Sequence, residues 1–158
     1  MDSGGDLTYL RRAIGLAARS RAAGNHPFGA LVVAADGEVL AEAINRSVPG
    51  KGDPTGHAEL EAVRTASAAH PPEALCAATL YSSAEPCAMC AGAVYWSGIG
   101  RVVYGLSEAR LLALTGSHPE NPTLALPCRE VFARGQRAIE VIGPLLEDEA
   151  AAGHAGFW

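Results

Sequence analysis

The chain has 158 residues, of which 49% are apolar, and a formal net charge of −5. This length and composition predict one domain over residues 1–158 that can bury a sizeable core, and they exclude extended disorder. The negative charge and the lack of a lysine or arginine cluster argue against a nucleic-acid partner, because polynucleotide binding relies on basic surface for the phosphates.

Membrane and secretory segments are also not expected. No apolar run approaches the length of a membrane span. The first residues, MDSGGD, lack a basic region followed by an apolar one. We therefore expect no membrane partner and a cytoplasmic location. Four cysteines in such a chain are more typical of metal ligands or buried thiols than of disulfides.

The first part of the chain predicts a helix followed by a β-hairpin. Apolar residues recur at helical spacing over 7–23, and Asp6 is the candidate N-cap. An apolar strand over 28–35 and an alternating strand over 38–44 are joined by an Asp-Gly turn. The arginines of the helix are interpreted as a solvated face; they are Arg11, Arg12, Arg19 and Arg21.

The remainder alternates between helices and strands. In chain order it predicts a loop over 45–56, a helix from about 55 to 69, a strand over 77–83, a helix with Pro86 in its first turn, a strand over 101–104, a helix capped by Ser107 to about 114, a loop over 115–127, a helix near 128–133, a strand over 138–142 and a final helix opened by Pro144. This order predicts a three-layer α/β/α fold on a mixed sheet whose later strands are parallel.

Two short motifs together indicate a metal site. Cys87 and Cys90 are three residues apart at a predicted helix start, so both thiols share one face, and a helix N-terminus favours thiolate. His57 opens a different predicted helix. One imidazole and two thiolates suit Zn²⁺ and leave its fourth position open, as a catalytic zinc requires. A lone Cys-x-x-Cys could instead be redox-active, but the joint pattern favours zinc.

Glu59 follows His57 by two residues and is not needed as a ligand. A spare carboxylate beside a metal that activates water is a candidate proton shuttle. The predicted chemistry is hydrolysis at an electron-poor ring carbon that bears an amino group, with release of ammonia. The remaining cysteines and several histidines lack such a context. Cys76 and Cys128 are interpreted as structural, and His26, His70 and His118 as surface or loop residues.

Residues 7–116 resemble the zinc-dependent cytidine and nucleobase deaminase superfamily. Its signature is carried by DPTGHAE at 53–59 and EPCAMCAGA at 85–93, which are most similar to the branch of bacterial guanine deaminases and tRNA adenosine deaminases. The resemblance implies a cytidine-deaminase-like fold with five strands in its central sheet. It also implies zinc held by His57, Cys87 and Cys90, with Glu59 as the proton shuttle.

The resemblance further implies a set of substrate contacts and a homodimer. Asn45 is expected to hydrogen-bond the base, Phe28 to hold the ring, and a backbone N–H near Ala58 to bind the substrate. The aromatic Trp96 is similar to one in the guanine deaminases. The predicted substrate contacts are completed by Glu85 and Trp158.

The C-terminal segment, residues 144–158, is a candidate lid or an element swapped between subunits. In some guanine deaminases a C-terminal aromatic closes over the neighbouring subunit's site, and Phe157 and Trp158 are candidates for that role. The alternative is that they pack on their own domain.

The resemblance to the guanine and tRNA adenosine deaminases implies the substrate class, but it leaves open which heterocyclic ring is deaminated. A free nucleobase is expected, with guanine as the best single choice. However, guanine deaminases tend to carry an acidic pair in the segment after the fourth strand, and in residues 113–120 of this chain Glu120 is the only carboxylate. The alternatives are a tRNA-specific adenosine deaminase, a cytosine or aminotriazine deaminase, and a non-catalytic zinc-stabilised binding domain.

Overall fold

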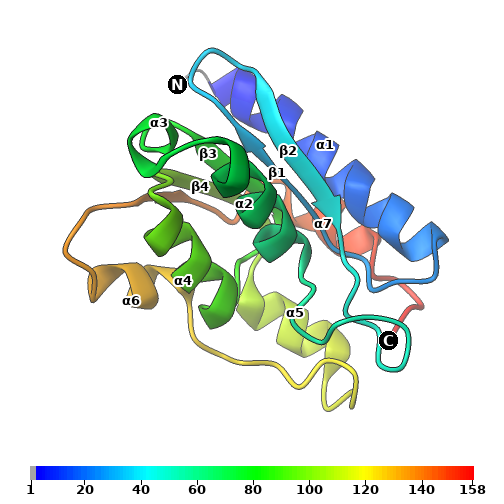
Figure 1. Cartoon of the computed structure of the whole chain (residues 1–158). Helices are drawn as coiled ribbons and strands as arrows, with labels where there is room; N and C mark the ends of the chain where they lie inside the picture. The colour runs from blue at the N-terminus through cyan, green and yellow to red at the C-terminus, as the bar shows by residue number, and fades with distance from the viewer. Residues whose placement is uncertain (1–2) are drawn as a thin grey trace.

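The computed structural model describes residues 3–158. Five strands form one sheet in the order β2-β1-β3-β4-β5 (Figure 1). They are β1 (Gly29–Val33), β2 (Val39–Ile44), β3 (Thr79–Ala84), β4 (Arg101–Leu106) and β5 (Glu140–Ile142). β1 is antiparallel to both β2 and β3, whereas β3, β4 and β5 are parallel. The predicted mixed five-stranded sheet with later strands parallel is confirmed.

Helices cover both faces of this sheet. The helices that precede β4 in the chain are α1 (Ser3–Ala22), α2 (Ala58–Ala69), α3 (Pro72–Leu75) and α4 (Ala88–Ser97). The helices that follow β4 are α5 (Glu108–Thr115), α6 (Cys128–Ala133) and α7 (Glu147–Ala152). α2, α4 and α6 pack on one face and α1 on the other, while α7 packs against β4 and against Ile14 of α1 (Figure 1). The three-layer α/β/α fold is thereby confirmed.

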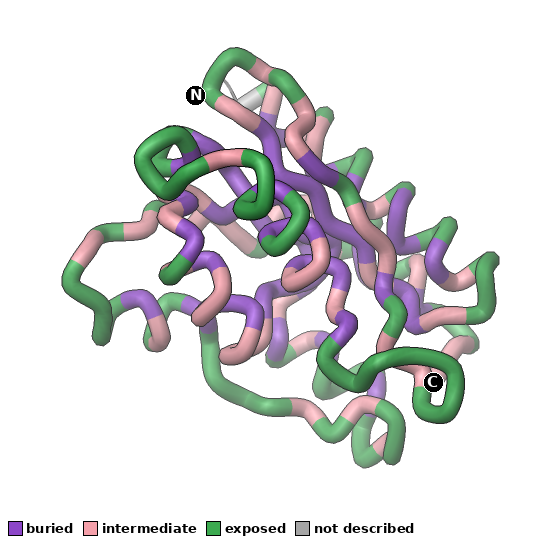
Figure 2. Tube along the Cα trace, in the orientation of Figure 1, coloured by how far each residue is buried: buried purple, intermediate pink, exposed green. Residues whose placement is uncertain are grey.

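The two cores follow from the alternation of side chains along each strand. Ala30 and Val32 face the layer of α2 and α4, whereas Leu31 and Val33 face α1. Figure 2 shows buried residues along the strands and on the helix surfaces that meet them. Small residues let the layers approach closely: a Cβ added at Gly29 would lie 2.5 Å from the backbone nitrogen of Ala17 in α1. The alternating pattern therefore determines which helices pack on each face of the sheet.

Several predicted boundaries need correction. α1 begins at Ser3, so Asp6 lies inside the helix instead of capping it. Pro86 precedes α4, whose N-cap is Cys87. Pro144 does not open the last helix, because residues 143–145 continue beside β4, where Leu145 donates its N–H to the Tyr104 carbonyl. The short α3 was not predicted. Ser107 does cap α5, accepting a hydrogen bond from the Arg110 N–H.

The arginines of α1 lie on an exposed face, as expected, apart from the half-buried Arg21. Arg11 forms an ion pair with Glu149, and Arg12 forms one with Glu42. Arg21 donates to the carbonyl oxygens of Gly153 and Ala155 and so ties the C-terminal segment to α1. No helix within residues 3–158 is long and apolar enough to cross a bilayer.

Candidate active site

The three predicted zinc ligands meet where two helices begin. His57 is the N-cap of α2 and Cys87 the N-cap of α4, and Cys90 lies in the first turn of α4. α2 and α4 pack against each other on the same face of the sheet. Because β3 ends at Ala84, directly before this motif, the ligands lie at the carboxyl end of a parallel strand. Sites in α/β sheets form at that end.

The ligand atoms have the spacing that zinc requires. Nδ1 of His57 lies 3.5 Å from Sγ of Cys87 and 3.6 Å from Sγ of Cys90, and the three ligand atoms lie within 4.8 Å of one another. A tetrahedral Zn²⁺ with bonds of about 2.05 Å to nitrogen and about 2.3 Å to sulfur separates these atoms by about 3.6 Å. Both nitrogen–sulfur distances therefore match those of a tetrahedral zinc site.

The local electrostatics favour a thiolate ligand. Hydrogen bonding from the Cys90 thiol, and then from His57, lowers the pKa of Cys87 to about 4 despite its burial. The N-terminus of α4 adds partial positive charge at the same point. The site can thus supply at least one anionic sulfur at neutral pH before a metal binds.

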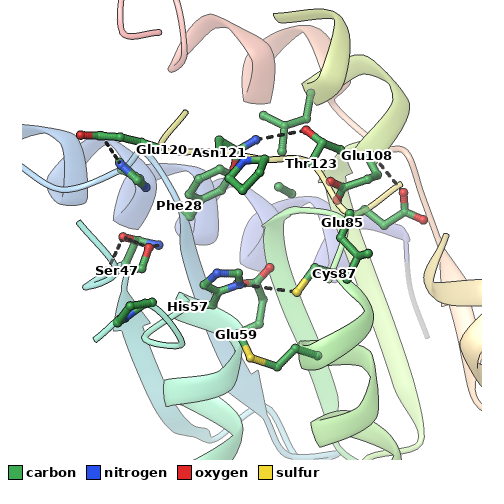
Figure 3. Close-up of a pocket in the computed structure, with 18 of the residues that line it drawn as sticks. Phe28, Ser47, His57, Glu59, Glu85, Cys87, Glu108, Glu120, Asn121 and Thr123 are labelled. Atoms are coloured by element: carbon green, nitrogen blue, oxygen red, sulfur yellow. Dashed lines mark hydrogen bonds and ion pairs between the residues drawn. The ribbon is translucent and has the colours of Figure 1, made fainter. Parts of the chain in front are cut away.

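Glu59 lies beside the ligands in the first turn of α2 and is buried (Figure 3). Its burial raises the pKa of its carboxyl group to about 7. A carboxyl group whose pKa is close to the working pH can both accept and return a proton. This position and this environment suit the proton-shuttle role that the sequence predicts for Glu59.

A cavity of about 430 Å³ opens onto Glu59 and the ligands. Of the predicted site residues, those that line it are Phe28, Asn45, His57, Glu59, Glu85 and Cys87. Cys90 and Ala58 are fully buried behind its wall. Residues 119–124, from the loop that follows α5, also line the cavity. The structure thus brings together residues from six separate stretches of the chain.

Asn45 is held in one orientation by its neighbour. Its Oδ1 accepts the Ser47 N–H at 2.9 Å, and its Nδ2 donates to the Ser47 hydroxyl at 2.9 Å. An amide nitrogen carries two hydrogens, so one donor remains for a ligand. The amide is therefore pre-oriented to donate to a carbonyl oxygen.

Two of the predicted substrate contacts, Glu85 and Trp96, have side chains that are bonded elsewhere or lie away from the cavity. Both carboxylate oxygens of Glu85 are occupied, because they accept the backbone N–H groups of Glu108 and Cys128. Glu85 thus links the starts of α5 and α6. Trp96 is 82% exposed and is not part of the cavity lining. It lies nine positions beyond Cys87 along α4, a rise of about 13 Å, so it does not reach the cavity of its own chain and the predicted contact is not made there.

The C-terminal aromatic residues pack on their own chain. The Trp158 ring lies 5.1 Å from that of His26 and 6.2 Å from that of Phe28, between centroids. Its Nε1 donates to Nδ1 of His154 at 2.9 Å. Burial lowers the pKa of His154 to about 4, so its imidazole is neutral and can accept this bond. The tail therefore supports the side of the cavity formed by His26 and Phe28.

Sequence reasoning missed two residues of the site and misplaced a cysteine. His26 was expected on the surface, but it is buried, lines the cavity, and its Nε2 lies 2.8 Å from Oε2 of Glu120. Its position two residues before Phe28 was the only available signal. Glu108 also lines the cavity and is buried, and nothing in the sequence indicated this. Cys76 was expected to be structural but is exposed.

Comparisons with known proteins agree with this geometry. Residues 4–106 match the family model described as the cytidine and deoxycytidylate deaminase zinc-binding region. The chain is 45% identical over 153 residues to a protein of Schizosaccharomyces pombe named as a probable cytosine deaminase, covering 97% of this chain and 92% of that one.

Solved structures extend the likeness to nearly the whole chain. The guanine deaminase from Nitrosomonas europaea is 32% identical with a TM-score of 0.73, covering 92% of this chain and 80% of that one. A protein solved in complex with 2,6-diaminopurine is 32% identical with a TM-score of 0.75, covering 95% of this chain and 82% of that one.

Proposed function

Because the chain belongs to the cytidine and deoxycytidylate deaminase zinc-binding family, we propose that it hydrolyses the amino group of a small free base, with cytosine as the preferred substrate. The reaction class is zinc-dependent deamination. Water is consumed, ammonia is released, and the amino-bearing carbon becomes a carbonyl, so cytosine would yield uracil.

The preference for cytosine over guanine is carried by the likeness to the S. pombe protein, which extends over 97% of this chain. The structure supplies a second argument. Glu120 is the one carboxylate in residues 113–120, the segment where guanine deaminases tend to carry an acidic pair, and one of its oxygens lies 2.8 Å from Nε2 of His26. We therefore place cytosine ahead of guanine, reversing the order expected from the sequence motifs. Guanine is the second candidate because of the likeness to the N. europaea enzyme.

The roles of this chain's own residues follow from their placement. When bound by His57, Cys87 and Cys90, zinc supplies the Lewis acid that activates water at neutral pH. Glu59 is placed to accept one proton of that water and deliver it to a ring nitrogen, and then to carry the proton of the added hydroxyl to the departing amino group, which leaves as ammonia while the carbon becomes a carbonyl. Asn45 donates to a ring carbonyl, and Phe28 lies against the ring.

A polynucleotide substrate is disfavoured. The net charge is −5, and two of the α1 arginines are engaged by Glu149 and Glu42. We therefore propose a small-molecule substrate in place of tRNA. The homodimer implied by the family resemblance stays a prediction.

We expect the zinc-loaded protein to release ammonia from cytosine with a kcat/KM at least about tenfold above that for guanine, a difference of about 1.4 kcal/mol. A panel of cytosine, guanine, adenine, their nucleosides and an aminotriazine tests this order. Faster turnover of guanine would make the second candidate the substrate. Inosine formation on tRNA would support the tRNA enzyme, and bound zinc without any ammonia release would support a binding domain.

We also propose that the tail closes one side of the cavity within its own chain. Deleting Phe157 and Trp158 removes ring contacts with His26 and Phe28, and such contacts contribute about 1 kcal/mol each. The deletion should raise KM about tenfold and leave zinc content unchanged. Trp158→Phe, which keeps a ring but loses the bond to His154, is the matched control and should stay close to wild type. Unchanged kinetics in the deletion would exclude this role.

A further inference from the structure

Glu108 is a buried acid in the cavity that the proposed mechanism does not use. It is the first residue of α5 and is only 8% exposed. Figure 3 shows it on the side of the cavity formed by Glu85 and Cys87, across from Phe28 and Ser47. It therefore belongs to the wall opposite Ser47, the hydrogen-bond partner of Asn45.

The carboxylate of Glu108 has no hydrogen-bond donor among residues 3–158. Its backbone N–H donates to Oε2 of Glu85 at 2.9 Å, but this bond does not involve the carboxylate. Arg110 on the same helix is directed to Asp148, at 2.7 Å, and so does not neutralise it. The Glu108 oxygens are not fully enclosed, so solvent reaches them through the cavity. A ligand that excludes that solvent without supplying a donor would leave the carboxylate unpaired, which costs free energy. A ligand that supplies a donor in the cavity would remove this cost.

The chemistry of a base limits what that donor is. The reacting carbon must face Glu59 and the metal ligands, and the Asn45 amide is oriented to donate to a carbonyl. The ionised carboxylate only accepts hydrogen bonds, so a base that pairs with it must offer Glu108 a ring N–H. Free cytosine carries N1–H, and free guanine carries N9–H. In a nucleoside the same nitrogen carries the sugar.

We propose that Glu108 accepts the ring N–H that distinguishes a free base from its nucleoside, and that it thereby determines specificity for free bases. This inference rests on the proposed function, since it assumes that a base occupies the cavity. A nucleoside would place its sugar against a buried carboxylate and leave that group unpaired. Sites built to hydrogen-bond a substrate N–H reject analogues that lack it by up to about 10⁴-fold.

The test compares cytosine with 1-methylcytosine, or guanine with 9-methylguanine if guanine is the better substrate. The wild type should prefer the unmethylated base by about 10³-fold or more in kcat/KM. Glu108→Leu, which removes the acceptor at similar volume, should lower kcat/KM for the unmethylated base about 100-fold, mainly through KM. In this variant, the ratio of kcat/KM for the unmethylated base to kcat/KM for the methylated base should fall at least tenfold. Glu108→Gln keeps an acceptor oxygen and should lie between the two.

Glu147→Gln is the matched control for disturbance of α5. Its carboxylate accepts the N–H of Ser107, the N-cap of α5, and it does not line the cavity. It should leave the preference unchanged. An equal loss for both substrates in Glu108→Leu would make Glu108 structural and overturn the inference, as would an undiminished preference.

The outcome for Glu108 can be separated from the outcome for the proposed function. Wild-type protein that deaminates nucleosides as well as free bases would overturn the role of Glu108 and leave the deaminase intact. If no base is turned over, binding of cytosine and 1-methylcytosine to the zinc-loaded protein is measured by calorimetry. A preference for cytosine that Glu108→Leu abolishes would support the inference, and equal or absent binding would overturn it.

Discussion

Replacing Glu59 by glutamine should lower kcat for base deamination by about 10³-fold, the scale of general acid–base catalysis. Glutamine has nearly the same shape but cannot accept the proton of the attacking water. Since Glu59 is not one of the three zinc ligands, the variant should keep one zinc per chain. Ammonia release and zinc content, measured on the same sample, test both statements.

Glu61→Gln provides the control for this substitution. Glu61 also lies in the first turn of α2, but its carboxylate pairs with Arg64 and does not line the cavity. Its replacement should leave kcat within about twofold, as expected for a substitution remote from the reaction. A Glu59→Gln enzyme with wild-type kcat would refute the proton-shuttle role, whereas loss of zinc would show that the carboxylate also supports the metal site.

The reaction centre could be predicted from the sequence because its information is local. The spacing of Cys87 and Cys90 and the two-residue interval from His57 to Glu59 determine which side chains share a helix start. The alternation of apolar residues likewise predicted the strands. Each motif lies within one helix turn, but His57 and Cys87 are 30 residues apart, and their meeting at one site was predicted from the joint pattern and its resemblance to the zinc-dependent deaminases.

The substrate side of the cavity could not be predicted, because it depends on contacts between distant segments. His26 and Glu120 are 94 residues apart in the sequence and meet only in the fold. An acid at the start of a helix, such as Glu108, is ordinarily interpreted as favourable to the helix dipole. Its burial in the cavity follows from where α5 packs. Trp96 is the opposite case. Its position after the cysteine motif predicted a substrate contact, but it lies near the end of α4, away from the cavity.

The attachment of α1 to the sheet depends on a second buried charged group. The Asp6 carboxylate accepts two hydrogen bonds from the Arg101 guanidinium, both at 2.7 Å, and one from the Tyr81 hydroxyl at 2.8 Å. Asp6 is 4% exposed. Removing one member of a buried, hydrogen-bonded pair leaves the other charge without compensation and costs about 3–5 kcal/mol.

Asp6→Asn should therefore lower the free energy of unfolding by about 3–5 kcal/mol in urea titrations at neutral pH. Arg101 has a second partner, Glu140, whose side chain is 62% exposed. Glu140→Gln is thus the matched control and should cost less than about 1 kcal/mol, because exposed ion pairs contribute little. A similar decrease in the free energy of unfolding in both variants would show that the buried pair of Asp6 and Arg101 contributes no more stability than the exposed pair of Glu140 and Arg101.

The dependence of this loss on pH separates the charge of Asp6 from its packing. Hydrogen bonding from Arg101 lowers the pKa of Asp6 below its usual value of 3.8 in the folded protein. A carboxyl group with a depressed folded pKa contributes stability that is fully present above its unfolded pKa and is lost as pH falls through its folded pKa. The difference between wild type and Asp6→Asn should accordingly be constant from pH 7 to about pH 5 and shrink below about pH 4. A difference that stays constant down to pH 2 would assign the loss to packing, because a protonated Asp6 and an asparagine are then both neutral.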